Sequence, residues 1–200
     1  KSVLCMPMLN NEGELVGVVQ VLNKKDGGTF DDQDENLLEA LSVQAAVAIQ
    51  RAQLLEAFVE KQRIQESLKL AADIQMGMLP KEFPAFPDRE DFDLFASIIP
   101  AKEVGGDFYD FFLIDEDHLC FVIGDVSGKG VPAALFMAVT KTHVAASTIP
   151  GVEPSDILFR ANNELCKEND QGMFCTIFYG ILNTKTGEVH YSNGGHNPPY

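Results

Sequence analysis

The feature that most constrains the fold is a long run without glycine or proline, from Gln33 to Met76. A helix of about 44 residues would extend roughly 66 Å at 1.5 Å per residue. Asp32 and Glu35, at the start of the run, have the spacing of a capping box in which Asp replaces Ser or Thr. The run therefore predicts one long helix between a short N-terminal part and a longer C-terminal part of the chain.

Apolar and small residues recur along this run at alternating spacings of three and four, which is typical of a heptad seam. The seam comprises Leu38, Leu41, Ala45, Ala48, Ala52, Leu55 and Val59. It continues in another register at Ile64, Leu68, Ala71, Gln75 and Met78. Up to residue 52 the stripe is better explained by packing on its own domain, but beyond Arg51 no neighbouring domain is left to cover it. We therefore expect residues 37–79 to be a helical coiled-coil linker that forms a parallel homodimer.

The stretch between this helix and residue 130 predicts a β-hairpin. Two apolar runs, Asp107–Ile114 and Leu119–Gly124, flank the polar sequence 115–118. Folding the hairpin about this turn brings Asp107 opposite Asp125, with Cβ atoms about 5 Å apart. Like charges at that distance raise each other's pKa, and a hard divalent cation relieves the repulsion. The alternative is a pair of unrelated loop aspartates in an acidic protein.

A glycine loop follows the hairpin. Gly128, Lys129 and Gly130 lead into a helix-forming sequence with a proline near its first turn. Such a loop at a helix N-terminus can accept a phosphate, although similar loops also serve only to make turns. Lys129 would then meet either that phosphate or only solvent.

Four motifs resemble the metal-dependent serine/threonine protein phosphatases of the PPM type, in their SpoIIE/RsbU-like branch. The motifs are GGDFYD (105–110), GDVSGKGVPAAL (124–135), DIQMGMLP (73–80) and SNGGHNPP (192–199). The resemblance implies an α+β fold, a layered α-β-β-α sandwich, over residues 80–200. Further metal-binding aspartates of the family have no counterpart before residue 200, so we expect this domain to be incomplete at its C-terminus and the fragment to be weakly active.

The resemblance also implies the site. Asp107 and Asp125 would be the catalytic residues and, with the carbonyl of Val126, would hold two Mn²⁺ or Mg²⁺ ions. The candidates for binding phosphate or substrate are Gly106, Gly128, Lys129, Gly130 and His196. From the residues alone, His196 is equally well explained as a hydrogen-bonding residue that fixes its loop. Asp110 could support the site indirectly or bond a loop backbone.

Residues 1–36 predict two strands, Ser2–Leu9 and Leu15–Leu22, and resemble the C-terminal end of a GAF sensory domain. The matching signature is Asn23-Lys24, then Phe30, Asp34 and Glu35. In that family the lysine and the aspartate form a structural salt bridge, which here implies Lys24 with Asp34. The chain begins inside an apolar strand without Met, so we expect a fragment at both ends.

The remaining C-terminal segments follow an order of strands, helices and strands, which favours an α+β fold. We expect a strand over 92–99, helices over 131–147 and 155–167, and a second hairpin over 173–192.

Charge and cysteine usage restrict the partners and the compartment. The net charge is −15, and residues 80–125 hold twelve acidic and three basic side chains. Such a field disfavours binding to nucleic acid and to anionic membranes. The four cysteines show no CxxC spacing, no apolar run reaches the roughly 18 residues needed to span a bilayer, and no signal peptide is visible. We therefore expect reduced thiols in a cytoplasmic protein.

Three functions compete. The leading one is a metal-dependent phosphatase that acts on a phosphoserine or phosphothreonine regulatory protein, such as an anti-sigma-antagonist-like regulator, under control of the upstream GAF sensor. The second is a non-catalytic dimeric signalling or scaffold module with a phosphatase-like fold. The third, another two-metal enzyme such as a nuclease, is disfavoured because phosphate backbones need Lys and Arg for neutralisation.

Overall fold

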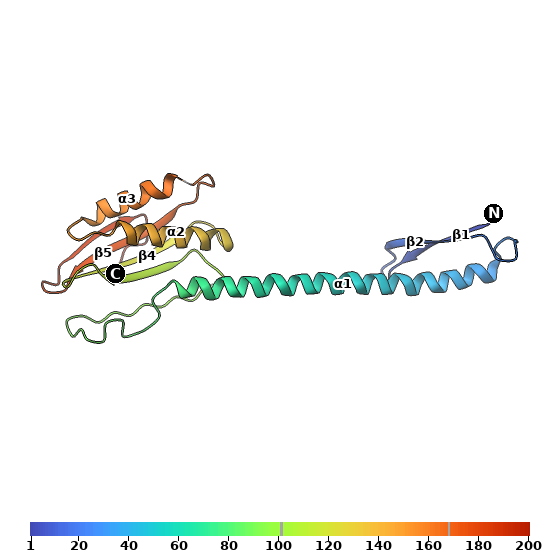
Figure 1. Cartoon of the computed structure of the whole chain (residues 1–200), viewed down its shortest axis with the longest axis horizontal. Coiled ribbons are helices and arrows are strands. Elements are labelled where there is room, and N and C mark those ends of the chain that lie inside the picture. Colours follow the sequence, from blue (N-terminus) through green and yellow to red (C-terminus); the bar gives the residue numbers. More distant parts are fainter. Residues whose placement is uncertain (101, 168) are drawn as a thin grey trace. The chain divides into compact units, whose positions relative to one another are not determined.

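The computed structural model describes residues 1–100, 102–167 and 169–200 (Figure 1). It divides into two compact units, Lys1–Glu66 and Ser67–Tyr200, which are described separately below. The division falls within helix α1 (Asp32–Gly77), so the predicted long helix is confirmed. Every helix in the described ranges is too short or too polar to cross a lipid bilayer.

The first unit begins with an antiparallel hairpin of β1 (Val3–Leu9) and β2 (Leu15–Leu22). The Asn10 side chain closes the turn, because its oxygen accepts the backbone N–H groups of Glu12 and Glu14. This is the turn chemistry that an Asn-containing loop predicts.

The capping box of α1 lies one residue earlier than the sequence predicted. The Asp31 carboxylate accepts the N–H groups of Gln33 and Asp34, and the Asp34 carboxylate accepts the N–H of Asp31. Lys24 Nζ lies 2.5 Å from Asp34 and 2.8 Å from Asp31. The predicted Lys24–Asp34 ion pair is therefore present, and Asp31 joins it. The hydrogen bonds that Lys24 donates to the Asp31 and Asp34 carboxylates raise its pKa.

The part of α1 beside the hairpin buries a narrow face (Figure 1). Leu38, Ser42 and Ala46 are 7%, 2% and 0% exposed. Leu38 belongs to the predicted seam, but Ser42 and Ala46 do not. Of the other seam residues, Leu41 is 51% exposed and Leu55 is 64% exposed. Most of the seam is thus left in solvent.

The second unit is built on an antiparallel sheet with the strand order β3-β4-β5-β6. The strands are β3 (Phe108–Leu113), β4 (His118–Val126), β5 (Cys175–Asn183) and β6 (Val189–Gly194). Helices α2 (Val131–Ser147) and α3 (Pro154–Lys167) lie together on one face of this sheet (Figure 1). The buried residues between sheet and helices include Cys120, Val126, Met137, Ile157 and Tyr179. The α+β class is confirmed.

The face away from α2 and α3 is only partly covered. Phe178 stacks on Tyr191 with ring centroids 5.2 Å apart, yet Tyr191 is 62% exposed and Ile123 of the same face is 48% exposed. The described residues form no second sheet across this face, so the layered sandwich is not seen here. The prediction of a strand over 92–99 is wrong. This segment alternates in burial as a strand does, but it pairs with no other strand of the described chain, and Phe95 and Ile99 are 77% and 93% exposed.

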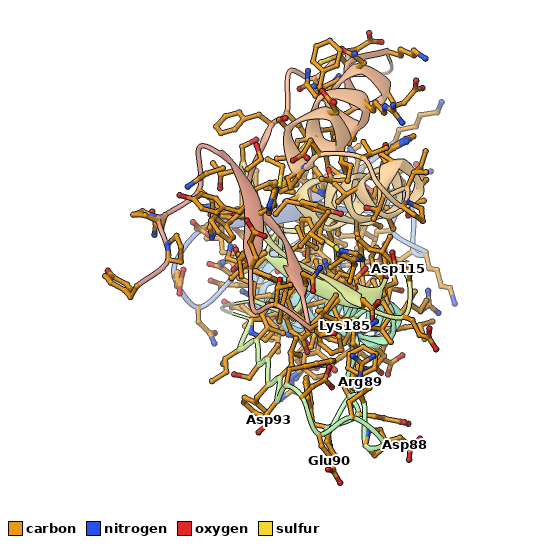
Figure 2. All side chains as sticks on the ribbon, turned by 90° about the vertical axis from the view of Figure 1, so that its left-hand side faces the viewer. Asp88, Arg89, Glu90, Asp93, Asp115 and Lys185 are labelled. Carbon is orange, nitrogen blue, oxygen red and sulfur yellow. The ribbon has the colours of Figure 1, made fainter. Side chains whose placement is uncertain are left out.

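The described residues between α1 and β3 have no regular secondary structure, and Arg89 anchors this loop. The guanidinium donates to the Asp91 carboxylate, to the carbonyl of Glu116 and to the hydroxyl of Thr184. It also lies 5.1 Å from the centroid of the Phe92 ring. In Figure 2 Arg89 turns inward, whereas Asp88, Glu90 and Asp93 point outward around the edge of the loop. The loop is therefore tied to the turns of both hairpins.

Candidate phosphatase site

The β3–β4 hairpin has the predicted register. Its pairs run from Phe108 with Gly124 to Leu113 with Leu119, and one further step places Asp107 opposite Asp125. Side chains alternate between the faces of a strand, and Phe108 and Val122 belong to the core beneath α2 and α3. The two aspartates therefore project from the open face at the end of the hairpin away from its turn.

Asp107 and Asp125 line one cavity of about 220 Å³. Gly106, Gly128 and Lys129 line the same cavity, together with Gln75 and Leu79 from the end of α1 and the residues that follow it. Five of the residues predicted from the sequence are thus brought together. Val126, Gly130 and His196 lie beside this group but do not line the cavity.

The two neighbouring carboxylates repel each other, and a bound cation would offset this repulsion. Partial burial raises the pKa of Asp107 first, and the neighbouring Asp125 carboxylate raises it further, while His196 opposes the shift. Two adjacent carboxylates are the oxygen ligands that Mg²⁺ and Mn²⁺ prefer. Among the described residues, no three or more His, Cys, Asp or Glu side chains are grouped so as to hold a metal ion. The residues present therefore fit part of a metal centre.

Gly106 permits a close approach of two backbone segments. A Cβ atom on this residue would lie 2.8 Å from the carbonyl oxygen of Val126 and 2.9 Å from its Cβ. Real Cβ atoms do not come so near to a neighbouring atom, so only glycine fits without a shift of the backbone. The close contact sets the Val126 carbonyl against the loop that carries Asp107.

The glycine loop after β4 turns on residues with positive φ. Gly128 has φ of 90° and Gly130 has φ of 73°, a region that glycine occupies without steric cost. Gly130 is the N-cap of α2 and has no capping side chain, and a proline lies in the first turn of the helix. The turn leaves the exposed Lys129 at the cavity wall.

His196 fixes its own loop, as the simpler reading of the sequence suggested. The backbone N–H of His196 donates to the side-chain oxygen of Asn193 at 2.8 Å, and Asn193 Nδ2 donates back to the backbone carbonyl of His196 at 3.0 Å. Its Nδ1 lies 3.0 Å from the hydroxyl of Thr176, which also donates to the Asp125 carbonyl at 3.4 Å. Thr176 is a supporting residue that sequence reasoning missed, because only the β4–β5 register places it opposite Asp125.

Asp110 is a structural residue on the opposite face of the sheet. Its carboxylate lies 2.6 Å from Lys141 Nζ of α2, and the two side chains are 9% and 19% exposed. One carboxylate oxygen also accepts the N–H of Phe111. Neither contact leads to the candidate site.

Gln75 is a second residue that sequence reasoning missed. Its Nε2 donates to the Gly105 carbonyl at 2.6 Å, and the Gly105 N–H donates to its Oε1 at 3.2 Å. The available signal was a polar residue at a position of the seam where the pattern predicts an apolar one.

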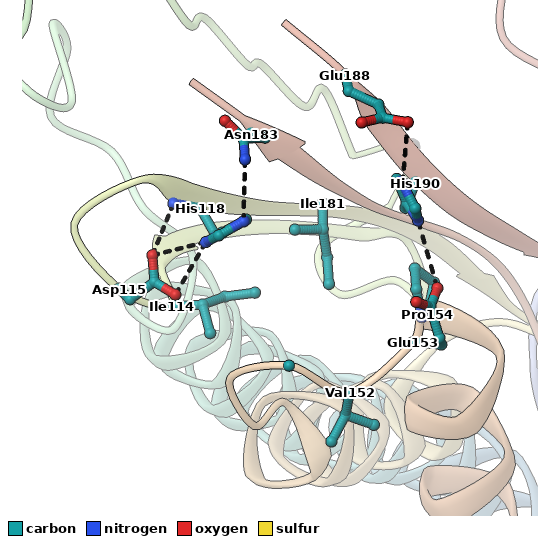
Figure 3. Close-up of a pocket in the computed structure, with 11 residues that line it drawn as sticks. Ile114, Asp115, His118, Val152, Glu153, Pro154, Ile181, Asn183, Glu188 and His190 are labelled. Carbon is teal, nitrogen blue, oxygen red and sulfur yellow. Dashed lines mark hydrogen bonds and ion pairs between the residues drawn. The ribbon is translucent and has the colours of Figure 1, made fainter. Parts of the chain in front are cut away.

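A separate cavity of about 190 Å³ lies at the turn end of the β3–β4 hairpin (Figure 3). His118 Nδ1 lies 2.8 Å from Asp115, and the imidazole also meets Asn183. His190 lies between Glu153 and Glu188, at 3.4 Å from each. His118 begins β4 and Asp125 lies near the other end of the same strand. His118 therefore has no part in the candidate site.

The comparisons with known proteins agree with these motifs. Residues 115–200 match the family model described as stage II sporulation protein E (SpoIIE), and residues 1–49 match the GAF domain model. The phosphoserine phosphatase RsbU of Bacillus subtilis is 33% identical over 140 residues, which are 70% of this chain and 41% of that protein. Protein IcfG of Synechocystis sp. is 32% identical over 164 residues, covering 66% of this chain and 25% of that protein. The chain thus spans less than half the length of these two curated relatives.

A solved structure supports the fold alone. The SiaA-PP2C domain of Pseudomonas aeruginosa superimposes with a TM-score of 0.55 at 20% identity, covering 68% of this chain and 54% of that one. The family matches and the RsbU relative confirm both resemblances drawn from the sequence. The chain therefore combines a GAF-domain segment with a region of the SpoIIE/RsbU-like branch of the PPM phosphatases.

Proposed function

We propose that the protein is a metal-dependent phosphatase that hydrolyses phosphoserine or phosphothreonine in a regulatory protein. The observation that carries the proposal is the pair of carboxylates, Asp107 and Asp125, in one cavity with Lys129. The similarity to a phosphoserine phosphatase supports the same reaction. The acidic character of the chain favours a protein substrate over nucleic acid.

Each residue has a proposed task. Asp107, Asp125 and the Val126 carbonyl would hold two Mn²⁺ or Mg²⁺ ions, which when bound supply an activated water for hydrolysis. Lys129, in the glycine loop at the wall of the same cavity, would pair with the phosphate oxygens of the substrate. Thr176 and His196 keep the Asp125 backbone in place through their hydrogen-bonded chain.

The proposed regulation uses α1 as a homodimeric coiled-coil linker between residues 37 and 79. The seam residues Leu55, Val59 and Ile64 are 64%, 43% and 52% exposed, which a second copy of the helix would cover. A GAF sensor joined to such a helix could set the activity of the phosphatase region. Inserting three or four residues near Arg63 should change this regulation, since each residue rotates a helix by about 100°. Regulation that survives the insertion unchanged would contradict the coupling.

The deciding experiment for the activity is a phosphatase assay of the full natural protein on a phosphoserine peptide. We expect turnover with Mn²⁺ and its loss after EDTA. A well-folded, dimeric protein without turnover would instead favour the non-catalytic signalling module. We place the protein in the cytoplasm, in keeping with its four free thiols.

A further inference from the structure

The end of α1 reaches the candidate site through one buried side chain. Gln75 lies in the last turns of the helix and is 8% exposed. Its amide forms two hydrogen bonds with the backbone of Gly105, one as donor and one as acceptor. A side-chain amide that pairs both polar groups of one residue acts as a neighbouring strand would.

These two bonds matter because Gly105 belongs to no strand. The segment Val104–Gly106 precedes β3; Val104 and Gly106 are buried, and Gly105 between them is partly shielded from water. Buried backbone N–H and C=O groups need partners, and here Gln75 provides them for Gly105.

The position of Asp107 follows from contacts on both sides of it. Phe108 is fixed by pairing with Gly124, and Gly106 is pressed against the Val126 carbonyl. Gly105 is fixed by Gln75. Without Gln75, the Gly105 backbone would lose both of these hydrogen bonds on the side of Asp107 away from β3.

We infer that Gln75 is a positioning residue: it holds Gly105, and through Gly105 and Gly106 it orients Asp107 for metal binding. The inference deepens the proposed function and rests on it for its consequence in catalysis. It also means that a shift of the last turns of α1 would move Gly105 and change the position of Asp107, because both hydrogen bonds join the Gln75 side chain to Gly105.

The test compares Gln75→Met and Gln75→Ala with the wild type in the full natural protein. Methionine has a similar length and stays apolar in a buried position, so the fold is preserved while both hydrogen bonds are lost. Hydrogen exchange of the metal-free protein is measured on a peptide covering residues 102–108. We expect exchange there to become at least about tenfold faster, and Mn²⁺ affinity to fall by about tenfold to 100-fold, as for other residues that orient a metal ligand. The kcat should fall with it while the KM for the phosphopeptide stays unchanged.

Two controls separate positioning from general stability. Gln65→Met changes an exposed glutamine of the same helix and should alter nothing. Tyr109→Phe removes the hydrogen bond from the Tyr109 hydroxyl to the Pro80 carbonyl, and should lower the melting temperature without lowering Mn²⁺ affinity.

The inference is overturned if the Gly105 amide of the wild type exchanges as fast as an unprotected amide. It is also overturned if Gln75→Met leaves exchange and Mn²⁺ affinity unchanged, or if Tyr109→Phe lowers the affinity as much as Gln75→Met does. Exchange is measured without metal or substrate, so it decides on Gln75 even if the protein proves to have no phosphatase activity.

Discussion

Asp107 lies directly across the β3–β4 hairpin from Asp125, one residue beyond the pair formed by Phe108 and Gly124. The two side chains project from the face that α2 and α3 leave open. Their mutual repulsion, together with partial burial, raises the pKa of Asp107.

Asp125→Asn should abolish Mn²⁺-dependent phosphatase activity in the full natural protein while leaving the fold intact. Removing a residue that only supports a metal ligand costs 10–100-fold, so loss of a ligand should cost at least about 100-fold. The measurements are turnover of a phosphoserine peptide and Mn²⁺ affinity by calorimetry. Asp88→Asn, at an exposed site in the loop after α1, is the control. Near-normal turnover in Asp125→Asn would show that the metal centre is built elsewhere.

Gly106→Ala should impair the site, whereas Gly105→Ala should be tolerated. A methyl group at Gly106 would lie 2.8 Å from the Val126 carbonyl oxygen, but at Gly105 no atom lies within 4 Å. We expect Gly106→Ala to cost about 1–3 kcal/mol of unfolding free energy. Misplacing the Asp107 loop should lower kcat about tenfold to 100-fold. Urea denaturation and steady-state kinetics on both variants check this, and equal behaviour of the two would contradict it.

Leu55→Glu should convert the proposed dimer to monomer, and Leu54→Glu should not. Both leucines are 64% exposed, but only Leu55 lies on the predicted seam, where a charge would be enclosed between two helices. Light scattering at high micromolar concentration measures the mass of each variant. A wild-type protein that is monomeric under these conditions would refute the coiled-coil proposal.

Lys141→Met should destabilise the second unit by about 3 kcal/mol, because it leaves the Asp110 carboxylate buried without its partner. The exposed pair of Lys167 with Glu164, with side chains 64% and 48% exposed, provides the matched control. Lys167→Met should change the free energy of unfolding by less than about 1 kcal/mol. Urea denaturation followed by circular dichroism gives both values. A small effect of Lys141→Met would mean that water reaches Asp110.

Only two of the four cysteines should react with a thiol reagent in the native protein. Cys5 and Cys166 are exposed, whereas burial raises the pKa of Cys120 and of Cys175 to about 12. At pH 8 the thiols of Cys120 and Cys175 would then be thiolate in about one molecule in ten thousand. Titration with Ellman's reagent should show two rapid thiols, and two more after denaturation. The double variant Cys5→Ser with Cys166→Ser should show none until it is unfolded.

Local patterns predicted the elements whose causes are local. The helix of α1 follows from a long run of helix-forming residues, and the register of Asp107 with Asp125 follows from turn residues between two apolar runs. Both depend on residues close together in the chain.

Contacts between distant segments could not be predicted in the same way. The strand expected over 92–99 has the right alternation, but a strand also needs a neighbour, which the pattern does not supply. Lys141 is the partner of Asp110 only because α2 crosses β3, and Thr176 supports Asp125 only because β5 pairs with β4. Gln75 appeared as an irregularity in a seam until the fold placed Gly105 against it.

The anchoring of the loop after α1 by Arg89 also sets an order of assembly. Its contacts with Glu116 and Thr184 join residues 27 and 95 positions apart in the chain. Contacts across such separations form only after the intervening chain has closed into its own structure. The loop after α1 is synthesised before the strands of this unit, yet it is among the last segments to reach its final position. Before the turn that precedes β6 has formed, Arg89 has no contact with Thr184, and the loop that carries Phe83, Phe86 and Phe92 is less firmly held. During synthesis these rings must therefore be kept from associating with other exposed apolar groups.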